Sequence, residues 1–207
     1  MGYVIVLAVA YLMGSSNLAY FLSKLKKVDL KADGSGNLGA SNATILLGWW
    51  SGILVGAHDI GKAALAVFLA EWIFPDLPYI GAVAGVAGVA SVMGHIFPFY
   101  LKFKGGKGFA SFLGMTLALN WKLALVIMAV VVIVTVITDY IVIGTATTVI
   151  TVPVAEGLLT RSFIVALILL VATGVILYKH RENFVRIRNR TEFGLKSAIR
   201  GDKRVKK

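Results

Sequence analysis

The chain has 207 residues, of which 58% are hydrophobic and 15% are charged, and its mean hydropathy is +0.84. Soluble domains are about 45–50% apolar and about 25% charged, so this composition excludes a soluble globular enzyme and indicates a polytopic membrane protein. The absence of cysteine excludes disulfides, thiolate metal sites and a cysteine nucleophile. The three histidines are too few and too dispersed to predict a zinc site.

Hydrophobic runs predict the membrane spans. Residues 1–23 carry no charge, and no basic residue precedes Lys24, so this run is interpreted as a span and not as a signal peptide. Helices are expected, because the bilayer core offers an open backbone no hydrogen-bond partners. Further apolar runs lie at about 48–74, 79–101, 109–119, 123–138, 141–159 and 162–178.

The distribution of positive charge decides between six and seven spans. The run 109–119 is short, and 109–138 is alternatively one long span. With seven spans and the N-terminus outside, 18 of the 21 Lys and Arg residues face the cytoplasm, in 24–44, 102–108 and the tail from 179. Six spans would place the first two regions opposite the tail, against the positive-inside rule. The sequence therefore predicts an all-α protein with seven transmembrane helices, the fourth short or tilted.

The same asymmetry explains the net charge of +11. Attraction to an anionic inner leaflet accounts for this charge better than binding to nucleic acid does. A seven-helix membrane domain is predicted over 1–190, followed by a loosely ordered, basic cytoplasmic tail over 191–207. Small residues at helical spacing in the third span predict close packing against neighbouring helices; they are Gly81, Gly85, Gly88 and Ser91.

Two glycine-rich segments on the predicted cytoplasmic side are candidate anion sites. Residues 33–42, DGSGNLGASN, combine flexible glycines with the donors Ser35, Asn37, Ser41 and Asn42. Glycine lets successive amides turn toward one point, and such a nest holds anions. Residues 102–108, KFKGGKG, are similar to phosphate-cradling loops without being a Walker A sequence. The alternatives are a flexible loop and an ordinary positive-inside loop, but two such segments on one face favour a phosphate site.

A third polar cluster, KHREN at 179–183, ends the last span. His180 is suited to proton transfer near neutral pH, and Asn183 lies at i+3 on the same helical face. Arg181 is suited to a phosphate or an anionic lipid, and an interfacial anchor is the alternative for the whole cluster. Within the second span, Asp59 and Lys62 are expected to form an ion pair next to His58, as a structural clamp or as support for a site.

These clusters, in this order on these spans, resemble the bacterial acyl-phosphate:glycerol-3-phosphate acyltransferases, the PlsY family. The matching stretches are GSSNLAYFLSK (14–24), VDLKADGSGNLGASNAT (28–44), DIGKA (59–63), GHIFPFYLKFKGGKGFAS (94–111) and HRENFVRI (180–187). They cover nearly the whole chain and are jointly specific. The resemblance implies a multi-pass enzyme of the bacterial inner membrane that moves a fatty acyl group from acyl phosphate to the 1-hydroxyl of glycerol 3-phosphate. The implied products are lysophosphatidic acid and phosphate, made without acyl-carrier protein or coenzyme A.

Carried over by position, the resemblance implies catalytic roles for Ser35, Lys107, His180 and Asn183. It implies substrate binding by Gly36, Asn37, Gly39, Asn42, Lys104, Gly105, Gly106 and Gly108. No metal or cofactor is implied. Both substrates carry phosphate, so amides and Lys107 can hold them and stabilise developing charge. Phosphate is a good leaving group, so no enzyme nucleophile is needed, and either the substrate's phosphate or His180 accepts the hydroxyl proton.

The chain departs from the family pattern at Ile45, where the family has an arginine expected to grip the glycerol phosphate through two parallel hydrogen bonds. Compensation by another cation such as Lys31, a different acceptor and loss of activity are the possible consequences. Lys179 in place of the family's arginine, and Ser16 and Asn17 in the first span, are milder changes.

Two other functions stay open, an acyltransferase of this fold with another acceptor and a lipid or anion transporter. Transport needs polar groups along a continuous path through the membrane, and no inverted repeat of broken helices is evident. Here the polar residues gather on one face, with only the group of His58, Asp59 and Lys62 deeper. The sequence therefore favours an enzyme.

Overall fold

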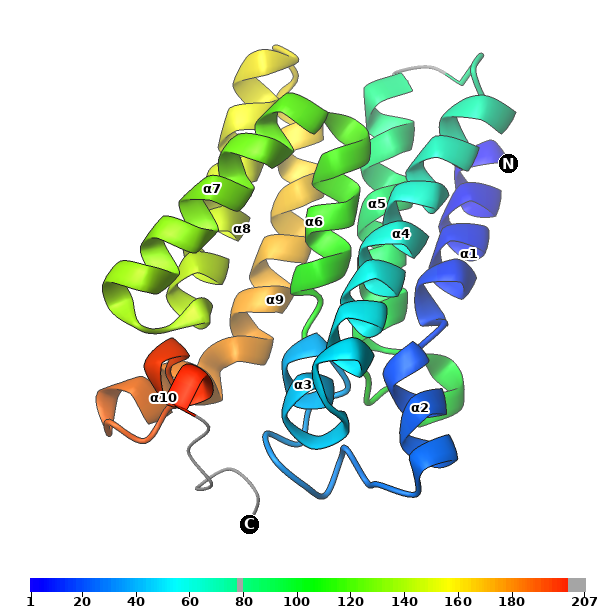
Figure 1. Ribbon diagram of the computed structural model, residues 1–207. Helices are drawn as coiled ribbons and strands as arrows, with labels where there is room; N and C mark the ends of the chain where they lie inside the picture. The colour runs from blue at the N-terminus through cyan, green and yellow to red at the C-terminus, as the bar shows by residue number, and fades with distance from the viewer. Residues whose placement is uncertain (78–79, 201–207) are drawn as a thin grey trace.

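The protein is described by a computed structural model that covers residues 1–77 and 80–200. Within these residues the chain is all helical, a bundle of long helices with shorter helices at one end (Figure 1). In chain order the helices are α1 Gly2–Ser15, α2 Leu18–Lys26, α3 Ala40–Leu47, α4 Trp49–Ile73, α5 Ile80–Ile96, the 3-10 helix η1 Phe99–Leu101, α6 Phe109–Leu119, α7 Trp121–Thr138, α8 Ile141–Leu159, α9 Phe163–Arg188 and α10 Leu195–Arg200.

The predicted seven-helix arrangement is confirmed. Six segments of the described chain are long and apolar enough to cross a membrane, and α6 is a shorter apolar helix between them. That short helix is the fourth in order, as the charge distribution predicts. Large apolar side chains such as Ile137 on α7 and Leu158 on α8 are exposed on the outside of the bundle, where lipid takes the place of water as the solvent.

The first span is interrupted, where the sequence predicts one unbroken run over 1–23. α1 ends at Ser15, and α2 begins at Leu18 after an extended Asn17 whose side chain accepts the amide of Tyr20 at 2.9 Å. In an unbroken helix this amide would bond to a carbonyl of the preceding turn. Because the side chain of Asn17 accepts it instead, a new helix begins there. The break leaves the backbone carbonyl of Ser16 outside both helices, where Lys62 binds it.

α5 is the central helix, and it contacts α1, α4, α6 and α9. The predicted close packing of its small residues is confirmed, because Gly85 lies against Ile168 of α9 and Gly88 against Met115 of α6. The contact with α1 is closer still. A Cβ atom on Gly14 would lie 2.0 Å from the carbonyl oxygen of Ser91, so only glycine lets the two backbones meet there.

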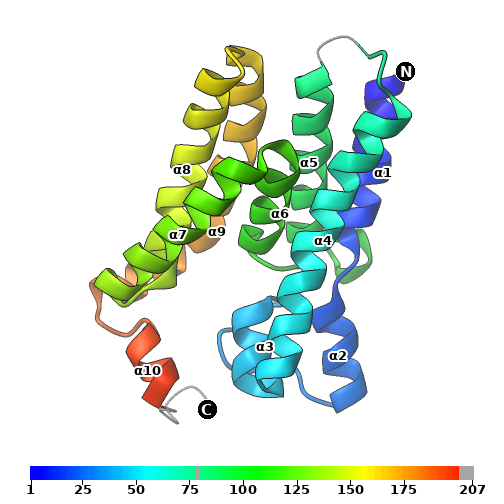
Figure 2. The ribbon, with the colours of Figure 1, turned by 45° about the horizontal axis from the view of Figure 1, so that its top comes forward.

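The three polar clusters lie at the same end of the bundle as α2, α3 and α10 (Figures 1 and 2). The region 24–44, which the charge distribution predicts to lie on the cytoplasmic side, ends in a helix, because α3 begins after Gly39. The predicted tail is also structured as far as Arg200, because α10 begins where the amides of Leu195 and Lys196 bond to Asp139 in the α7–α8 turn. Residues 201–207 of that tail lie outside the described residues.

Candidate active site

Lys107 and Asn183, which are far apart in the sequence, meet at the end of the bundle. Lys107 lies in the loop before α6, and its ammonium donates a hydrogen bond to Oδ1 of Asn183 near the end of α9. Asn183 is buried and Lys107 half-buried. Two of the four residues with expected catalytic roles are therefore in direct contact.

Glu192 fixes the orientation of the Asn183 amide. Its Oε1 accepts from Nδ2 of Asn183 at 2.6 Å, and its Oε2 accepts from Nε of Arg186 at 2.6 Å. The amide nitrogen thus faces Glu192, which leaves the amide oxygen for Lys107. Sequence reasoning missed both Glu192 and Arg186. The available signals were the position of Arg186 at i+3 from Asn183 and an isolated acidic residue in a basic tail.

His180 lies one turn before Asn183 on α9 and is buried. Its Nδ1 is 2.8 Å from the carbonyl oxygen of Ile176. Because a carbonyl only accepts, we assign the ring proton to Nδ1, which leaves Nε2 with the lone pair. A neutral imidazole held in this tautomer has one nitrogen available to accept a proton.

The glycine loop lies directly on the end of α5. The amides of Gly105 and Gly106 donate to the carbonyls of Ile96 and His95 at 3.0 and 3.1 Å. A Cβ atom on Gly106 would lie 2.0 Å from Nε2 of His95, so the loop approaches too closely for any other residue. These two amides are therefore engaged by the chain itself. The amides that helix geometry leaves unpaired for an anion belong to the first turn of α6, directly after Gly108.

The first glycine-rich loop is organised from within by Asn42. The side chain of Asn42 is fully buried; it accepts from the amide of Ser35 at 2.9 Å and donates to the carbonyl of Leu30 at 2.9 Å. Gly34 and Gly36 have φ of +63° and +66°, the left-handed region that favours glycine. Among the described residues, no hydrogen bond or ion pair joins this loop to Lys107, His180 or Asn183. The structure therefore places Ser35 and Asn37 at the same end of the bundle as these three residues, but it shows no hydrogen bond between the two groups among the described residues.

The position where the family has an arginine and the lysine that is the candidate to replace it lie in two different places. Ile45 is half-buried on α3. Lys31, the candidate replacement, lines a pocket of about 430 Å³ between α2 and the following loop, together with Lys24 and Lys27. Neither Lys107 nor any residue of α9 lines that pocket. Lys31 therefore belongs to a separate basic pocket.

Three other cations of the two motifs have ordinary surroundings. Lys104 is exposed. The ammonium of Lys179 lies 5.6 Å from the centre of the Phe97 ring, at the distance of a cation–π contact. Arg181 donates to the carbonyl of Tyr178 and lies over the ring of that residue. Lys107 is therefore the cation of the glycine loop that the structure connects to α9.

The electrostatic environment of Lys107 differs from that of an exposed lysine. Burial lowers its pKa below the ordinary value, and the positive charge of Arg186 acts in the same direction, while Glu192 opposes both. Fewer competing waters surround a buried ammonium, so its interaction with an anion is stronger than at the surface.

The fold and the site together define an integral membrane protein with a polar, lysine-containing site at one end of its helix bundle. A sequence model described as glycerol-3-phosphate acyltransferase matches residues 4–190. The chain belongs to the glycerol-3-phosphate acyltransferase family.

Curated relatives and solved structures agree with this assignment. The chain is 34% identical over 195 residues to a glycerol-3-phosphate acyltransferase of Thermoanaerobacter pseudethanolicus, which covers 93% of this chain and 96% of the relative. It is 35% identical to glycerol-3-phosphate acyltransferase 1 of Oceanobacillus iheyensis, covering 95% and 97%. The crystal structure of PlsY (YgiH), an integral membrane glycerol 3-phosphate acyltransferase, in its glycerol 3-phosphate form superimposes with a TM-score of 0.88 at 31% identity, covering 96% of this chain and 98% of that one. Its lysophosphatidic acid form superimposes with a TM-score of 0.83.

Proposed function

We propose that this protein transfers a fatty acyl group from acyl phosphate to the 1-hydroxyl of glycerol 3-phosphate, giving lysophosphatidic acid and phosphate. The observation that carries the proposal is the contact of Lys107 with Asn183 beside His180, in a chain whose relatives bear this activity. Two sequence motifs that are far apart in the chain thereby meet, at the end of the bundle that also holds the first glycine-rich loop. A phosphate headgroup can lie at this end while its acyl chain stays in the membrane.

The proposed chemistry needs no covalent intermediate. The glycerol hydroxyl oxygen forms a bond to the acyl carbon, and the bond from that carbon to the phosphate oxygen breaks. Lys107 and the first-turn amides of α6 stabilise the negative charge on the departing phosphate. The hydroxyl proton passes to Nε2 of His180, which carries the ring's lone pair, or to the phosphate itself.

A direct assay tests the proposal. Purified protein is incubated with palmitoyl phosphate and labelled glycerol 3-phosphate, and the lipid product is identified. Formation of lysophosphatidic acid at a rate that depends on both substrates is expected. No labelled lipid from a correctly folded preparation would contradict the proposal.

One observation favours a second candidate, an acyltransferase with another acceptor. Ile45 is half-buried on α3 and cannot donate a hydrogen bond, whereas the family is expected to hold the glycerol phosphate there with an arginine. The same assay with a panel of labelled alcohols distinguishes the two, since the preferred acceptor has the higher kcat/KM.

The pH dependence of the reaction is expected to reflect Lys107. Because its pKa is lowered, Lys107 loses its charge as the pH rises through a value below 10.5, the ordinary lysine pKa, and phosphate binding weakens there. We expect kcat/KM to fall on the alkaline side at a lower pH than an exposed lysine would give. Lys107→Arg keeps its charge at alkaline pH, so its alkaline fall should move to higher pH even if its maximum is lower. If kcat/KM fell at the same alkaline pH in the wild type and in Lys107→Arg, the result would contradict the role of Lys107.

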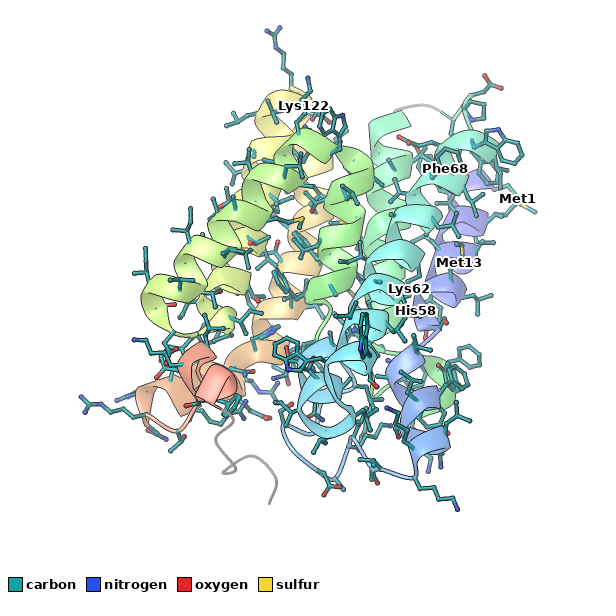
Figure 3. The ribbon with its side chains drawn as sticks, viewed as in Figure 1. Met1, Met13, His58, Lys62, Phe68 and Lys122 are labelled. Atoms are coloured by element: carbon teal, nitrogen blue, oxygen red, sulfur yellow. The ribbon has the colours of Figure 1, made fainter. Side chains whose placement is uncertain are left out.

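We also propose that the protein lies in the bacterial inner membrane with the N-terminus outside and the C-terminus in the cytoplasm. The support is the positive charge at the end of the bundle that holds α10, opposite the end that holds Lys122 (Figure 3). Single cysteines are informative because the chain has none. In intact cells, a membrane-impermeant maleimide should label Lys122→Cys, and should label Lys196→Cys only after permeabilisation. The reverse pattern would invert the topology.

A further inference from the structure

Charged and polar side chains meet inside the bundle, away from the contact of Lys107 with Asn183. We name them the Asp59 cluster: His58, Asp59 and Lys62 of α4, and His95 of α5. Asp59, Lys62 and His95 are 1%, 7% and 2% exposed. The predicted ion pair is confirmed, with Nζ of Lys62 2.7 Å from Oδ1 of Asp59. Two histidines that are far apart in the sequence approach the same carboxylate oxygen, His58 at 3.4 Å and His95 at 3.2 Å.

Lys62 is the centre of this cluster, because its ammonium reaches three helices. It donates to Oδ1 of Asp59 on its own helix and to the carbonyl of Ser16 at 2.6 Å, and it lies 3.0 Å from Nδ1 of His95 on α5. An ammonium has N–H groups and no lone pair, so it can only donate in these contacts. If Nδ1 of His95 accepts from Lys62, the ring proton lies on Nε2. Lys62 thus ties the α1–α2 break and α5 to α4.

His95 connects this cluster to the glycine loop. Its carbonyl accepts the amide of Gly106, and the neighbouring carbonyl of Ile96 accepts the amide of Gly105. Its ring lies so close to Gly106 that a Cβ atom there would be 2.0 Å from Nε2. Both the backbone and the ring of His95 therefore determine the path of the loop, and Lys107 is the next residue.

The stability of the fold does not by itself explain why a charged pair is buried inside the bundle. A buried ion pair is often no more stabilising than well-packed apolar residues of the same volume, because both charges must be removed from water. Buried polar contacts instead favour one arrangement of the groups that they join. Figure 3 shows His58 and Lys62 on α4 at the level where α1 gives way to α2, toward the end where the polar loops gather.

We propose that Asp59 and Lys62 are positioning residues for acyl transfer. By holding His95 in one orientation against Gly106, they set the path of the glycine loop and the position of Lys107. The proposal rests on the proposed function for its kinetic consequence, but its effect on the loop is measurable in the absence of any substrate.

The test uses a variant that removes both charges, Asp59→Asn together with Lys62→Met, so that no unpaired charge stays buried. Amide hydrogen exchange is followed in peptides that contain residues 103–108. In the wild type the amides of Gly105 and Gly106 are hydrogen-bonded; in the double variant they should exchange at least tenfold faster, while α9 keeps its exchange rate. The kcat/KM for acyl transfer should fall about tenfold without a comparable loss of thermal stability.

Lys26→Met is the matched control. Lys26 also joins separate helices, through the carbonyl of Leu47 and the hydroxyl of Ser51, but within the described part of the chain its side chain has no hydrogen bond to α5 or the glycine loop. Its exchange at 103–108 and its kcat/KM should equal those of the wild type. Unchanged loop exchange in a folded double variant would overturn the proposal, and so would faster exchange spread evenly over all helices, which indicates a general clamp.

A second variant covers the case in which the double variant does not fold. His95→Asn leaves the pair of Asp59 and Lys62 in place, and the asparagine Oδ1, which is attached to Cγ as Nδ1 is, can still accept from Lys62, but the part of the ring that lies against Gly106 is lost. Faster exchange confined to 103–108 is expected, and unchanged exchange overturns the proposal. If the loop loosens as expected while even the wild type transfers no acyl group, the positioning holds and the proposed function fails.

Discussion

Lys107→Ala is expected to lower kcat/KM for acyl transfer roughly 10–150-fold, the equivalent of about 1.5–3 kcal/mol for one charge-assisted hydrogen bond to phosphate. Lys107 is half-buried and bound to Asn183, and its backbone follows two glycine amides that are fixed on α5. Its ammonium is therefore held in one place, so alanine removes an interaction that mobile surface cations do not replace. Steady-state kinetics with both substrates varied measures the loss.

The matched control is Lys196→Ala, because Lys196 is an exposed cation at the same end of the molecule whose side chain has no hydrogen bond or ion pair among the described residues. The kcat/KM of this variant is expected to be within a factor of two of the wild-type value. Equal activity of the two variants, at equal expression and with intact fold, would contradict the assignment of Lys107 to the site.

Ile45→Arg is expected to lower the KM for glycerol 3-phosphate about tenfold, which corresponds to about 1.4 kcal/mol. Ile45 lies half-buried on α3, directly after the loop that Asn42 organises. An arginine there can grip a phosphate through two parallel hydrogen bonds, which isoleucine cannot offer. The turnover number should change little, since the gain affects the bound substrate and the transition state alike.

The opposite result would identify a different acceptor. If Ile45 lines a pocket shaped for a less polar or larger alcohol, the new arginine is buried without a partner, which costs several kcal/mol and lowers activity or stability. Ile45→Leu is the control, because it keeps the apolar character at similar volume. A folded Ile45→Arg variant with unchanged or higher KM, together with a wild type that prefers another acceptor, would exclude glycerol 3-phosphate while the acyltransferase fold stands.

The properties that the sequence by itself determined are local ones. Runs of apolar residues set the number and order of the membrane helices, and the bias of Lys and Arg gathered the polar motifs at one end. The pair of Asp59 and Lys62 was predictable because i and i+3 positions lie on one face of any helix. The positions of the two glycine-rich loops followed in the same way, from composition over ten residues or fewer.

The tertiary structure alone decided what those motifs contact. Asn42 was expected to bind substrate, yet its side chain is buried within its own loop, and that contact depends on how the chain folds back from Leu30. Glu192 lies in a segment that composition assigns to a loose tail, but the bonds of the next residues to Asp139 bring it to Asn183.

The Asp59 cluster shows most clearly why the sequence did not predict the contacts between distant residues. His95 lies on a different helix from Asp59, and the two meet because α4 and α5 pack closely through small buried residues such as Ala66 and Ala87. Side-chain contacts between distant residues depend on how whole helices pack, to within an ångström, and no local pattern carries that information. The sequence thus determined which residues are available for chemistry, and the packing of α4, α5 and α9 determined which of them meet.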